Sequence, residues 1–430
     1  MVTRITVIAW VAALLSAQPA QVAQPGVKAF TGFTLIDGRG LAPVPNAVLV
    51  VRDGRIVAAG GASSTQVPEG AERMDLRGLF VMPGMVNAHG HVGSTVGLEA
   101  RPDGYTEDNL RRQLRLYARN GVTTVVSLGD DREAGFRLRD ESGGAALNRA
   151  RVYVAGPVIA AKTPEEARSA VDKVADMKPD WIKIRVDDNL GTSEKMQPDV
   201  YRAVIARAHE RKLRVAAHLF YLADAKDLLR AGADYLAHSV RDAEVDAELI
   251  ELMKARSVCL CPTLMREVST FVYESRPAFF DDPFFKLQAD PKVLAALEDP
   301  ARQATVRKSQ SAQRYKQALA QAKRNLKALH AAGVGIAAGT DTGPPTRFQG
   351  YFEHLELEQM VASGLTPPQV IASATGEAAR CLGLADRVGT LQPGRHADFI
   401  VLTKSPLDDI RNTRTIESVW IGGAAVTGGR

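Results

Sequence analysis

The sequence predicts an α/β protein, a (β/α)₈ barrel (TIM barrel) joined to a small composite β-sandwich that is built from both ends of the chain. Three observations lead to this prediction. Short apolar runs alternate with longer helical stretches through the middle of the chain, these runs number eight, and both chain ends read as β-structure with tight turns. The length of 430 residues accommodates a large barrel and an accessory domain.

The first residues have the layout of a secretory signal peptide. Arg4 precedes an apolar run from Ile5 to Leu15, and a stretch of small and polar residues follows. The run is too short to cross a bilayer, which takes roughly 20 apolar residues. We expect residues 1–23 to be removed, which leaves a periplasmic or secreted protein with no stable membrane span; a retained anchor or a frayed terminus is the alternative.

The two ends of the chain are expected to form one domain. Residues 28–80 alternate apolar and polar residues, with Asp53-Gly54 placed as a hairpin turn, and residues 384–430 repeat this pattern with Gly422-Gly423 as a turn. Each segment is too small to bury a core alone, so we expect them to pair as the two parts of the β-sandwich.

Residues 81–383 are expected to form the barrel. Its eight predicted strands are LFVMPGMVNAH, VTTVVSL, RVYVAG, DWIKIRV, RVAAHLF, DYLAHSV, SVCLCPTL and VGIAAGTD. Extra structure is expected in the insertion over residues 264–332: one or two long helices from about Pro300 to Ala332, preceded by an aromatic, proline-broken segment that suits a lid or a homo-oligomer contact.

Composition excludes several classes of protein. The chain is 45% hydrophobic and 24% charged, which is ordinary for a globular protein, and its net charge of +5 comes from residues spread along the chain, so we expect no nucleic-acid partner. The three cysteines, Cys259, Cys261 and Cys381, cannot form the framework of a disulfide-rich scaffold. We expect Cys259 and Cys261 to be buried core thiols and disulfides not to hold the fold.

Residues able to bind metal fall at the ends of the predicted strands. His89 and His91 are two positions apart, so on a strand both imidazoles project from one face. Lys183 lies between Ile182 and Ile184, which places it on the inward face, where a charged amine needs a partner or a modification. Three further candidates end later strands: His218, His238 and Asp341. A (β/α)₈ barrel assembles its active site from these C-terminal strand ends.

This ordered set of motifs resembles the amidohydrolase superfamily, in particular its imidazolonepropionase-like and prolidase-like branch. The matching segments are PGMVNAHGH, WIKI, VAAH, LAHS, GTDTG and the tail from VIASATGEAAR to HADFIVL. The resemblance implies a binuclear site with His89, His91 and Asp341 on one metal, His218 and His238 on the other, and a carbamylated Lys183 bridging both with a hydroxide. Zn²⁺ is the expected metal, since imidazole and carboxylate ligands favour it.

Such a site predicts a metal-dependent hydrolase. We expect it to cleave a C–N amide bond in a small amide or peptide substrate, such as an N-acyl amino acid or a dipeptide, with Asp341 as the catalytic acid–base group. The alternatives are a lactonase or cyclic amide hydrolase of the same fold, or a catalytically silent binding protein.

Three residues are predicted to contact the substrate. Arg185 shares the inward face of Lys183, and Arg241 follows His238 by three residues; both are expected to overlook the metals and to bind a substrate carboxylate, with surface salt bridges as the alternative. Tyr221 is a candidate donor to the substrate carbonyl, with simple packing as the alternative.

Overall fold

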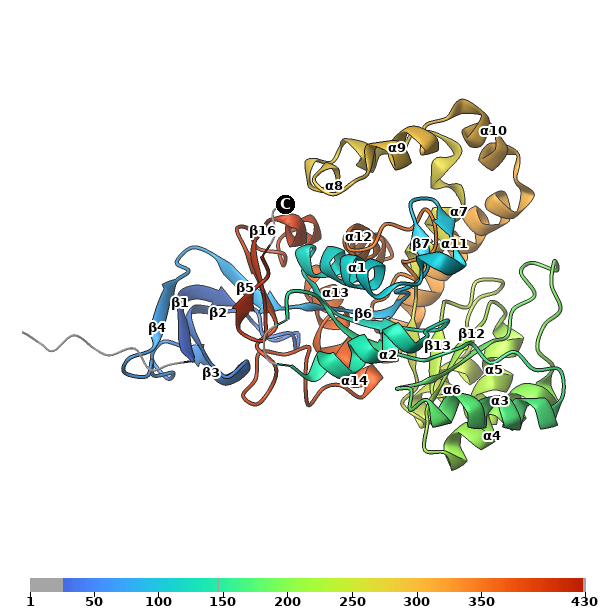
Figure 1. Ribbon diagram of the computed structural model, residues 1–430, viewed down its shortest axis with the longest axis horizontal. Coiled ribbons are helices and arrows are strands. Elements are labelled where there is room, and N and C mark those ends of the chain that lie inside the picture. The colour runs from blue at the N-terminus through green and yellow to red at the C-terminus, as the bar shows by residue number, and fades with distance from the viewer. Residues whose placement is uncertain (1–25, 145–146, 428–430) are drawn as a thin grey trace, which may run out of the picture.

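The computed structural model describes residues 26–144 and 147–427. It shows a mixed α/β protein with a strand-rich part at one end and a larger part in which helices surround short strands (Figure 1). The predicted signal peptide lies outside the described residues. Within these ranges, no helix has the length and apolar character needed to cross a membrane.

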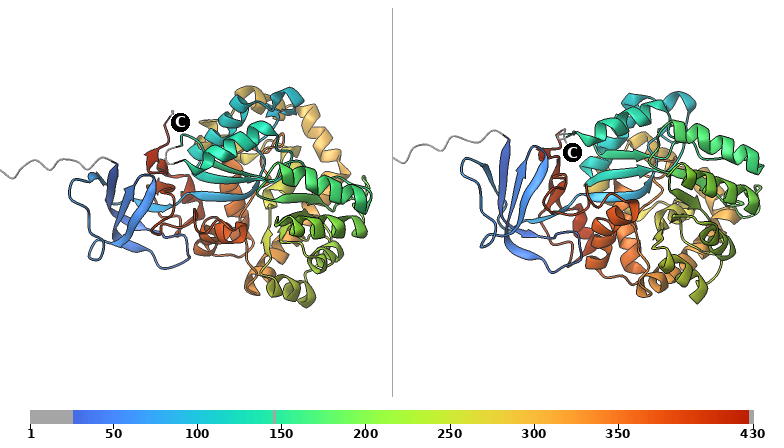
Figure 2. Two further views of the ribbon diagram at one scale, coloured as in Figure 1. Left: turned by 60° about the horizontal axis from the view of Figure 1, so that its bottom comes forward. Right: turned by 90° about the horizontal axis from the view of Figure 1, so that it is seen from below.

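Strands from both chain ends form one mixed sheet. Its strands run in the order β17-β16-β15-β5-β1-β2-β3, and β4 pairs with β1. The two ends meet where β5 pairs with β15 in antiparallel register, and Figure 2 shows the early strands beside the end of the chain. The bounds are β1 Val27–Leu35, β2 Val44–Arg52, β3 Arg55–Gly61, β4 Glu72–Asp75, β5 Phe80–Pro83, β15 Phe399–Leu402, β16 Ile416–Ile421 and β17 Ala424–Ala425.

The two predicted hairpin turns are confirmed. Asp53 and Gly54 connect β2 to β3 with φ angles of 49° and 75°. Gly422 and Gly423 connect β16 to β17 with φ angles of 58° and 71°. Positive φ at both central residues is what a tight two-residue hairpin requires, and it accounts for the Gly content of both turns.

In the middle of the chain, parallel strands and single bridges between them form a closed circuit. β6, β9 and β10 form one parallel sheet, and β11 to β14 form another. Single parallel bridges join the two sheets, from Ile159 to Ile184, and join the segment after Gly335 to both β14 and β6. The bounds are β6 Met85–Gly90, β9 Val122–Ser127, β10 Arg151–Val154, β11 Ile182–Arg185, β12 Val215–His218, β13 Tyr235–Ala237 and β14 Cys259–Cys261.

The eighth predicted strand, VGIAAGTD, differs from the expectation. Ile336 makes an isolated bridge to Leu260, and Thr342, directly after the segment, makes one to Gly90, but residues 334–341 form no regular strand. Gly335 and Gly339 lie in this segment, and a side chain at Gly339 would meet the His89 backbone nitrogen at 2.6 Å. The segment therefore lies very close to β6 but does not form the regular hydrogen-bond pattern of a strand.

Helices follow most of these strands and bury an apolar face against them. α1 is typical: Thr106 caps its first turn by accepting a hydrogen bond from the Asn109 amide, and its buried residues include Leu110, Leu114 and Tyr117. The other helices of this kind are α2 Glu133–Asp140, α3 Pro164–Asp176, α4 Pro198–Glu210, α5 Leu222–Ala231, α6 Ala247–Ala255, α12 Tyr351–Ala362, α13 Pro367–Ser373 and α14 Gly376–Leu382; α1 spans Glu107–Arg119.

The insertion contains two helices where the sequence predicts one or two, α10 (Pro300–Lys308) and α11 (Gln310–Ala331). The aromatic segment before them forms short helices, including α8 (Pro283–Lys286) and α9 (Pro291–Leu297), after α7 (Leu264–Phe271). Phe280 and Phe285 are about 1% exposed and pack with Tyr351 and Phe352 of α12. These two rings therefore anchor the insertion to its own chain and are not available for an oligomer contact.

The cysteine prediction needs a correction. Cys259, at the start of β14, forms a disulfide with Cys381 of α14, and Cys261 alone stays a buried thiol. The pair is 122 residues apart in sequence. Spacing along the chain could not reveal it, because the fold brings the start of β14 to α14.

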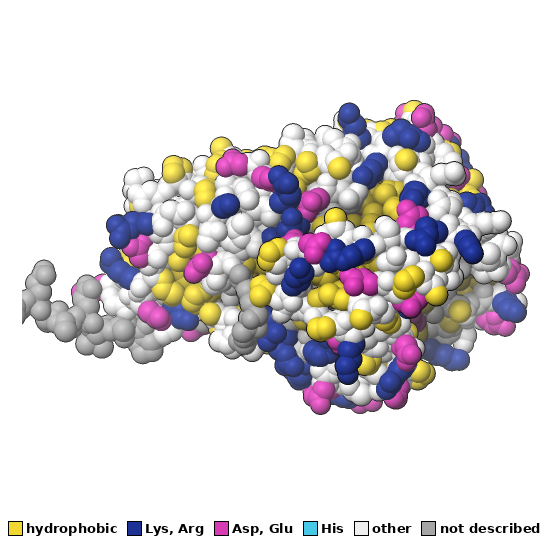
Figure 3. Space-filling model, turned by 90° about the horizontal axis from the view of Figure 1, so that it is seen from above, with side chains coloured by type: hydrophobic (Ala, Val, Ile, Leu, Met, Phe, Trp, Pro, Cys, Tyr) yellow, Lys and Arg dark blue, Asp and Glu magenta, His cyan; other side chains and the backbone are white. Residues whose placement is uncertain are grey.

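A buried ion pair connects the two parts of the molecule. The Arg151 guanidinium of β10 donates to both carboxylate oxygens of Asp398, at 2.6 and 3.0 Å, and both side chains are almost fully buried. On the face in Figure 3, Lys and Arg are interspersed with Asp and Glu. This distribution is typical of an ordinary solvated surface.

Candidate metal centre

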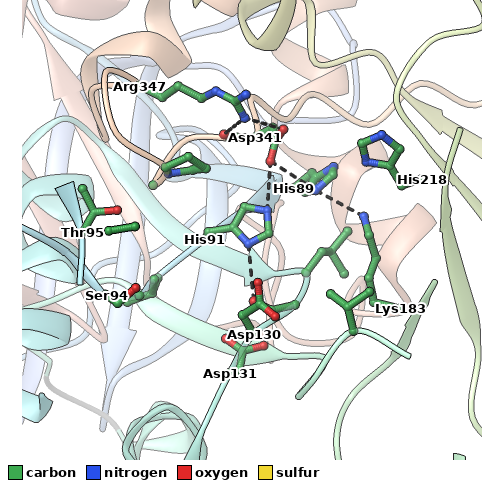
Figure 4. Close-up of a pocket in the computed structure, with 18 of the residues that line it drawn as sticks. His89, His91, Ser94, Thr95, Asp130, Asp131, Lys183, His218, Asp341 and Arg347 are labelled. Atoms are coloured by element: carbon green, nitrogen blue, oxygen red, sulfur yellow. Dashed lines mark hydrogen bonds and ion pairs between the residues drawn. The ribbon is translucent and has the colours of Figure 1, made fainter. Parts of the chain in front are cut away.

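The predicted ligands converge at the C-terminal ends of the parallel strands. His89 lies in β6, Lys183 in β11 and His218 at the end of β12, while His238 directly follows β13. Most of them line a cavity of about 620 Å³, and Figure 4 shows His89, His91, Lys183, His218 and Asp341 facing one another. His238 is fully buried beside them, with its ring centroid 4.1 Å from that of His218 and 4.7 Å from that of His89.

Three of the predicted ligands form a compact group. Donor atoms of His89, His91 and Asp341 all lie within 4.8 Å of one another. Asp341 Oδ1 is 2.9 Å from His91 Nε2 and 3.6 Å from His89 Nε2. Burial alone would raise the pKa of Asp341, but Arg347 and His91 outweigh it and hold the pKa well below its usual range. The carboxylate is therefore ionised and available to a cation.

The other three predicted ligands lie on the opposite side of His89. Lys183 Nζ is 3.4 Å from His89 Nε2, and burial lowers the pKa of this amine to about 8. His238 Nδ1 lies 2.6 Å from Thr263 Oγ1, while its Nε2 is buried without a hydrogen-bond partner. Burial also lowers the pKa of His218 to about 3 and that of His238 well below its usual range. Both imidazoles are therefore neutral, which is the state that binds metals.

These groups fit divalent metal ions. A buried imidazole nitrogen without a partner is costly, and His238 Nε2 is such an atom. The donor set combines neutral imidazoles, one ionised carboxylate and an amine, and imidazole with carboxylate is the set that zinc favours. We therefore infer that the cluster is built to hold cations.

Several residues around the cluster escaped the sequence analysis. Asp187 Oδ2 lies 2.7 Å from His218 Nε2, so this carboxylate orients the imidazole. Arg347 donates to Asp341 Oδ2 at 2.6 Å and also lines the cavity. Arg266 reaches the same cavity from α7. No motif marks these residues, because loops and the insertion bring them to the site.

A buried network fixes the backbone beside the ligands. Glu353 of α12 accepts three hydrogen bonds at Oε1, from Asn87 Nδ2 and from the hydroxyls of Thr340 and Thr342, at 2.6–2.7 Å. Asn87 Oδ1 in turn accepts from the His89 amide, and the two threonines flank Asp341. Glu353 therefore connects the segments that carry His89 and Asp341.

The three predicted substrate-binding residues lie in different environments. Arg185 is 44% exposed at its side chain, lines the cavity and donates to Asn189 Oδ1 at 2.9 Å. Tyr221 directly precedes α5, and its hydroxyl donates to Asp188 at 2.9 Å.

Arg241 requires a correction. Its side chain is fully buried, pairs with Glu267 at 3.0 Å, donates to the carbonyls of Leu219 and Ser239, and lies over the ring of Phe220. The expectation that it overlooks the metals assumed that a residue in the loop after His238 faces the cavity. Instead, the side chain turns inward and satisfies buried carbonyl groups.

Comparisons with known proteins agree with this site. The model of the Amidohydrolase family matches residues 80–426. Ochratoxinase from Aspergillus niger is 27% identical over 92% of this chain and 85% of its own length, and imidazolonepropionase from Deinococcus deserti is 26% identical over 90% and 94%. The crystal structure of a Bifidobacterium longum protein described as a prolidase superposes with a TM-score of 0.76 at 26% identity, covering 95% of this chain and 96% of that one.

The chain belongs to the amidohydrolase family. It is a hydrolase that acts on carbon–nitrogen bonds.

Proposed function

We propose that this protein is a binuclear metal-dependent hydrolase that cleaves the amide bond of a small substrate, an N-acyl amino acid or a dipeptide. The supporting observation is the convergence of six potential ligands at one end of the parallel strands, with His238 Nε2 buried and unpartnered among them. The closed circuit of parallel pairings supports a (β/α)₈ barrel as the scaffold, with the mixed sheet as its β-sandwich.

The metal ions would polarise the scissile carbonyl and lower the pKa of a bound water from about 15.7 to near 7. Asp341 would accept a proton from the attacking water and deliver it to the leaving amine. Because Asp341 is ionised, it can accept the proton in the first of these two steps. Arg347 and the Glu353 network hold Asp341 and its backbone in place.

We also propose that Lys183 is carbamylated. Carbamylation requires a neutral amine to react with carbon dioxide, and burial that lowers the pKa of Lys183 to about 8 raises the neutral fraction near neutral pH. The product is a carboxylate-like ligand in place of a buried cation. This removes the repulsion between an ammonium group and two metal ions.

Arg185 is proposed to bind a free carboxylate on the substrate. It is the predicted substrate-binding arginine whose guanidinium is exposed in the cavity. Arg185→Met should lower kcat/KM for carboxylate-bearing substrates far more than for the corresponding amides. Arg168→Met, on the exposed side of α3, is the matched control. Equal losses on both substrate series would show that Arg185 holds a loop and does not bind the substrate.

A hydrolysis panel tests the function itself. Zinc-reconstituted protein should release free amine from N-acyl amino acids or dipeptides, and this release should require the metal. Turnover of lactones or cyclic amides alone would assign the second candidate function, and no turnover of any class would leave a binding protein.

We propose that the mature chain works outside the cytoplasm. The buried disulfide between Cys259 and Cys381 supports this, because disulfides persist in oxidising compartments. N-terminal sequencing of protein from a native-type host should find a start between Gln18 and Gln24. A chain that still begins at Met1 or Val2 would contradict export.

A further inference from the structure

A second cavity opens beside the candidate metal centre. Its volume is about 140 Å³, and the two cavities share Thr95, Gly343, Pro344 and Arg347 as lining residues. Arg347 is held in place by Asp341 Oδ2 and by Ser269 Oγ. The second cavity therefore adjoins the metal centre at the side of Asp341, with the Arg347 side chain between them.

Apolar side chains from five parts of the chain line one portion of this second cavity, and polar and charged side chains line the rest. Leu98 comes from the turn after β7 (Thr95–Val96), Leu116 from α1, Val293 from α9, and Phe285 and Phe348 from α8 and the loop before α12. The insertion thus supplies part of the wall of the second cavity.

Several polar groups that line the second cavity have partners within the chain, among them Arg112, which donates to Asn109 Oδ1. Gln288 exchanges hydrogen bonds with Asn120, and Gln349 donates to the His91 carbonyl and to Gln113. Asp290 accepts from the Lys292 amide at the start of α9. The surface that can take an apolar group is therefore the portion lined by Leu98, Leu116, Phe285, Val293 and Phe348.

We propose that this second cavity binds an apolar acyl group of the substrate, a phenyl ring or an alkyl chain of about five or six carbons. A cavity of about 150 Å³ with apolar walls holds one benzene ring, which matches the volume found here. The proposal rests on the proposed amide hydrolysis and adds the acyl preference to it.

The position of the cavity assigns it to the acyl side of the amide. Arg185 is the last residue of β11, the fourth strand of the circuit. The second cavity instead lies beside Asp341, in the eighth segment, which bridges to the first strand. Arg185 and the second cavity thus lie across the metal centre from each other. A substrate whose carboxylate binds Arg185 directs its acyl group toward the second cavity.

The substitution Val293→Trp tests the proposal by filling the second cavity. Ala296→Trp, at an exposed position of the same helix, is the matched control. Each buried methylene is worth about fourfold in affinity, so wild type and A296W should prefer N-hexanoyl over N-acetyl amino acids. V293W should lose most of that preference, about tenfold or more. An unchanged preference in V293W would overturn the proposal.

Binding of toluene, followed by saturation-transfer NMR, separates this proposal from the proposed function. Wild type and A296W should show a toluene signal that V293W lacks. If that pattern appears but no amide is hydrolysed, the function fails and the apolar site stands. An equal toluene signal in V293W would overturn the site, whatever the enzyme hydrolyses.

Discussion

Removing the Glu353 carboxylate should disturb the metal centre without touching any ligand. Glu353 is 5% exposed, and its Oε1 accepts hydrogen bonds from Asn87, Thr340 and Thr342. Glu353→Ala removes an acceptor that these three buried donors share, although they keep hydrogen bonds to one another. Leaving a buried donor unsatisfied costs about 1–3 kcal/mol, so we expect a loss of stability of about that size. The residues that lose support position His89 and Asp341, so metal affinity should fall about 10–100-fold.

Thermal unfolding together with metal titration measures both effects. Glu353→Gln keeps one acceptor oxygen and should lie between wild type and the alanine variant. Glu358→Gln is the control on the same helix, since Glu358 is partly exposed, pairs with Arg414 and makes no contact with the Glu353 network. If Glu353→Ala unfolds at the wild-type temperature and binds metal with wild-type affinity, the network does not support the ligands and the reasoning is refuted.

Three further predictions concern other parts of the structure. Lys183→Ala should lose bound metal and activity, and added acetate or propionate should restore part of both; full activity without a carboxylate would rule out a bridging role. Burial raises the pKa of Asp131 to about 7, above an unfolded value of about 3.9, so its contribution to stability is complete below about pH 4 and is lost as the pH rises through 7. Asp131→Asn should therefore gain in stability relative to wild type between pH 5 and pH 8.5, by up to about 3 kcal/mol in the free energy of unfolding; parallel pH profiles would contradict this. Removing the disulfide by Cys259→Ala with Cys381→Ala should cost about 2–4 kcal/mol and abolish the effect of reductants on thermal unfolding; a wild-type response to reductant in that variant would contradict the assignment.

The convergence of the predicted ligands could be anticipated from sequence because strand geometry determines where their side chains point. His89 and His91 are two residues apart on one strand end, and Lys183 lies between two buried isoleucines. Period two therefore turns all three toward the site. The same reasoning could not place Arg241, because a loop residue has no such period and is positioned by whichever buried carbonyls it can satisfy.

Long-range contacts account for the features that the sequence did not reveal. The disulfide joins residues 122 positions apart, and Glu353 reaches Asn87 across 266 positions. Neither pair shares a local pattern, and both depend on how the strands close into a circuit. The hairpin turns at Asp53-Gly54 and Gly422-Gly423 show the opposite case, since a turn of two residues is encoded by those residues alone.

Metal content tests the central claim most directly. Elemental analysis of zinc-reconstituted, dialysed protein should give about two divalent ions per chain, because six potential ligands are too many for one tetrahedral ion. His238→Ala should bind fewer ions and remain folded, since it removes a ligand whose Nε2 makes no hydrogen bond. Wild-type protein that retains no metal after reconstitution would contradict the account.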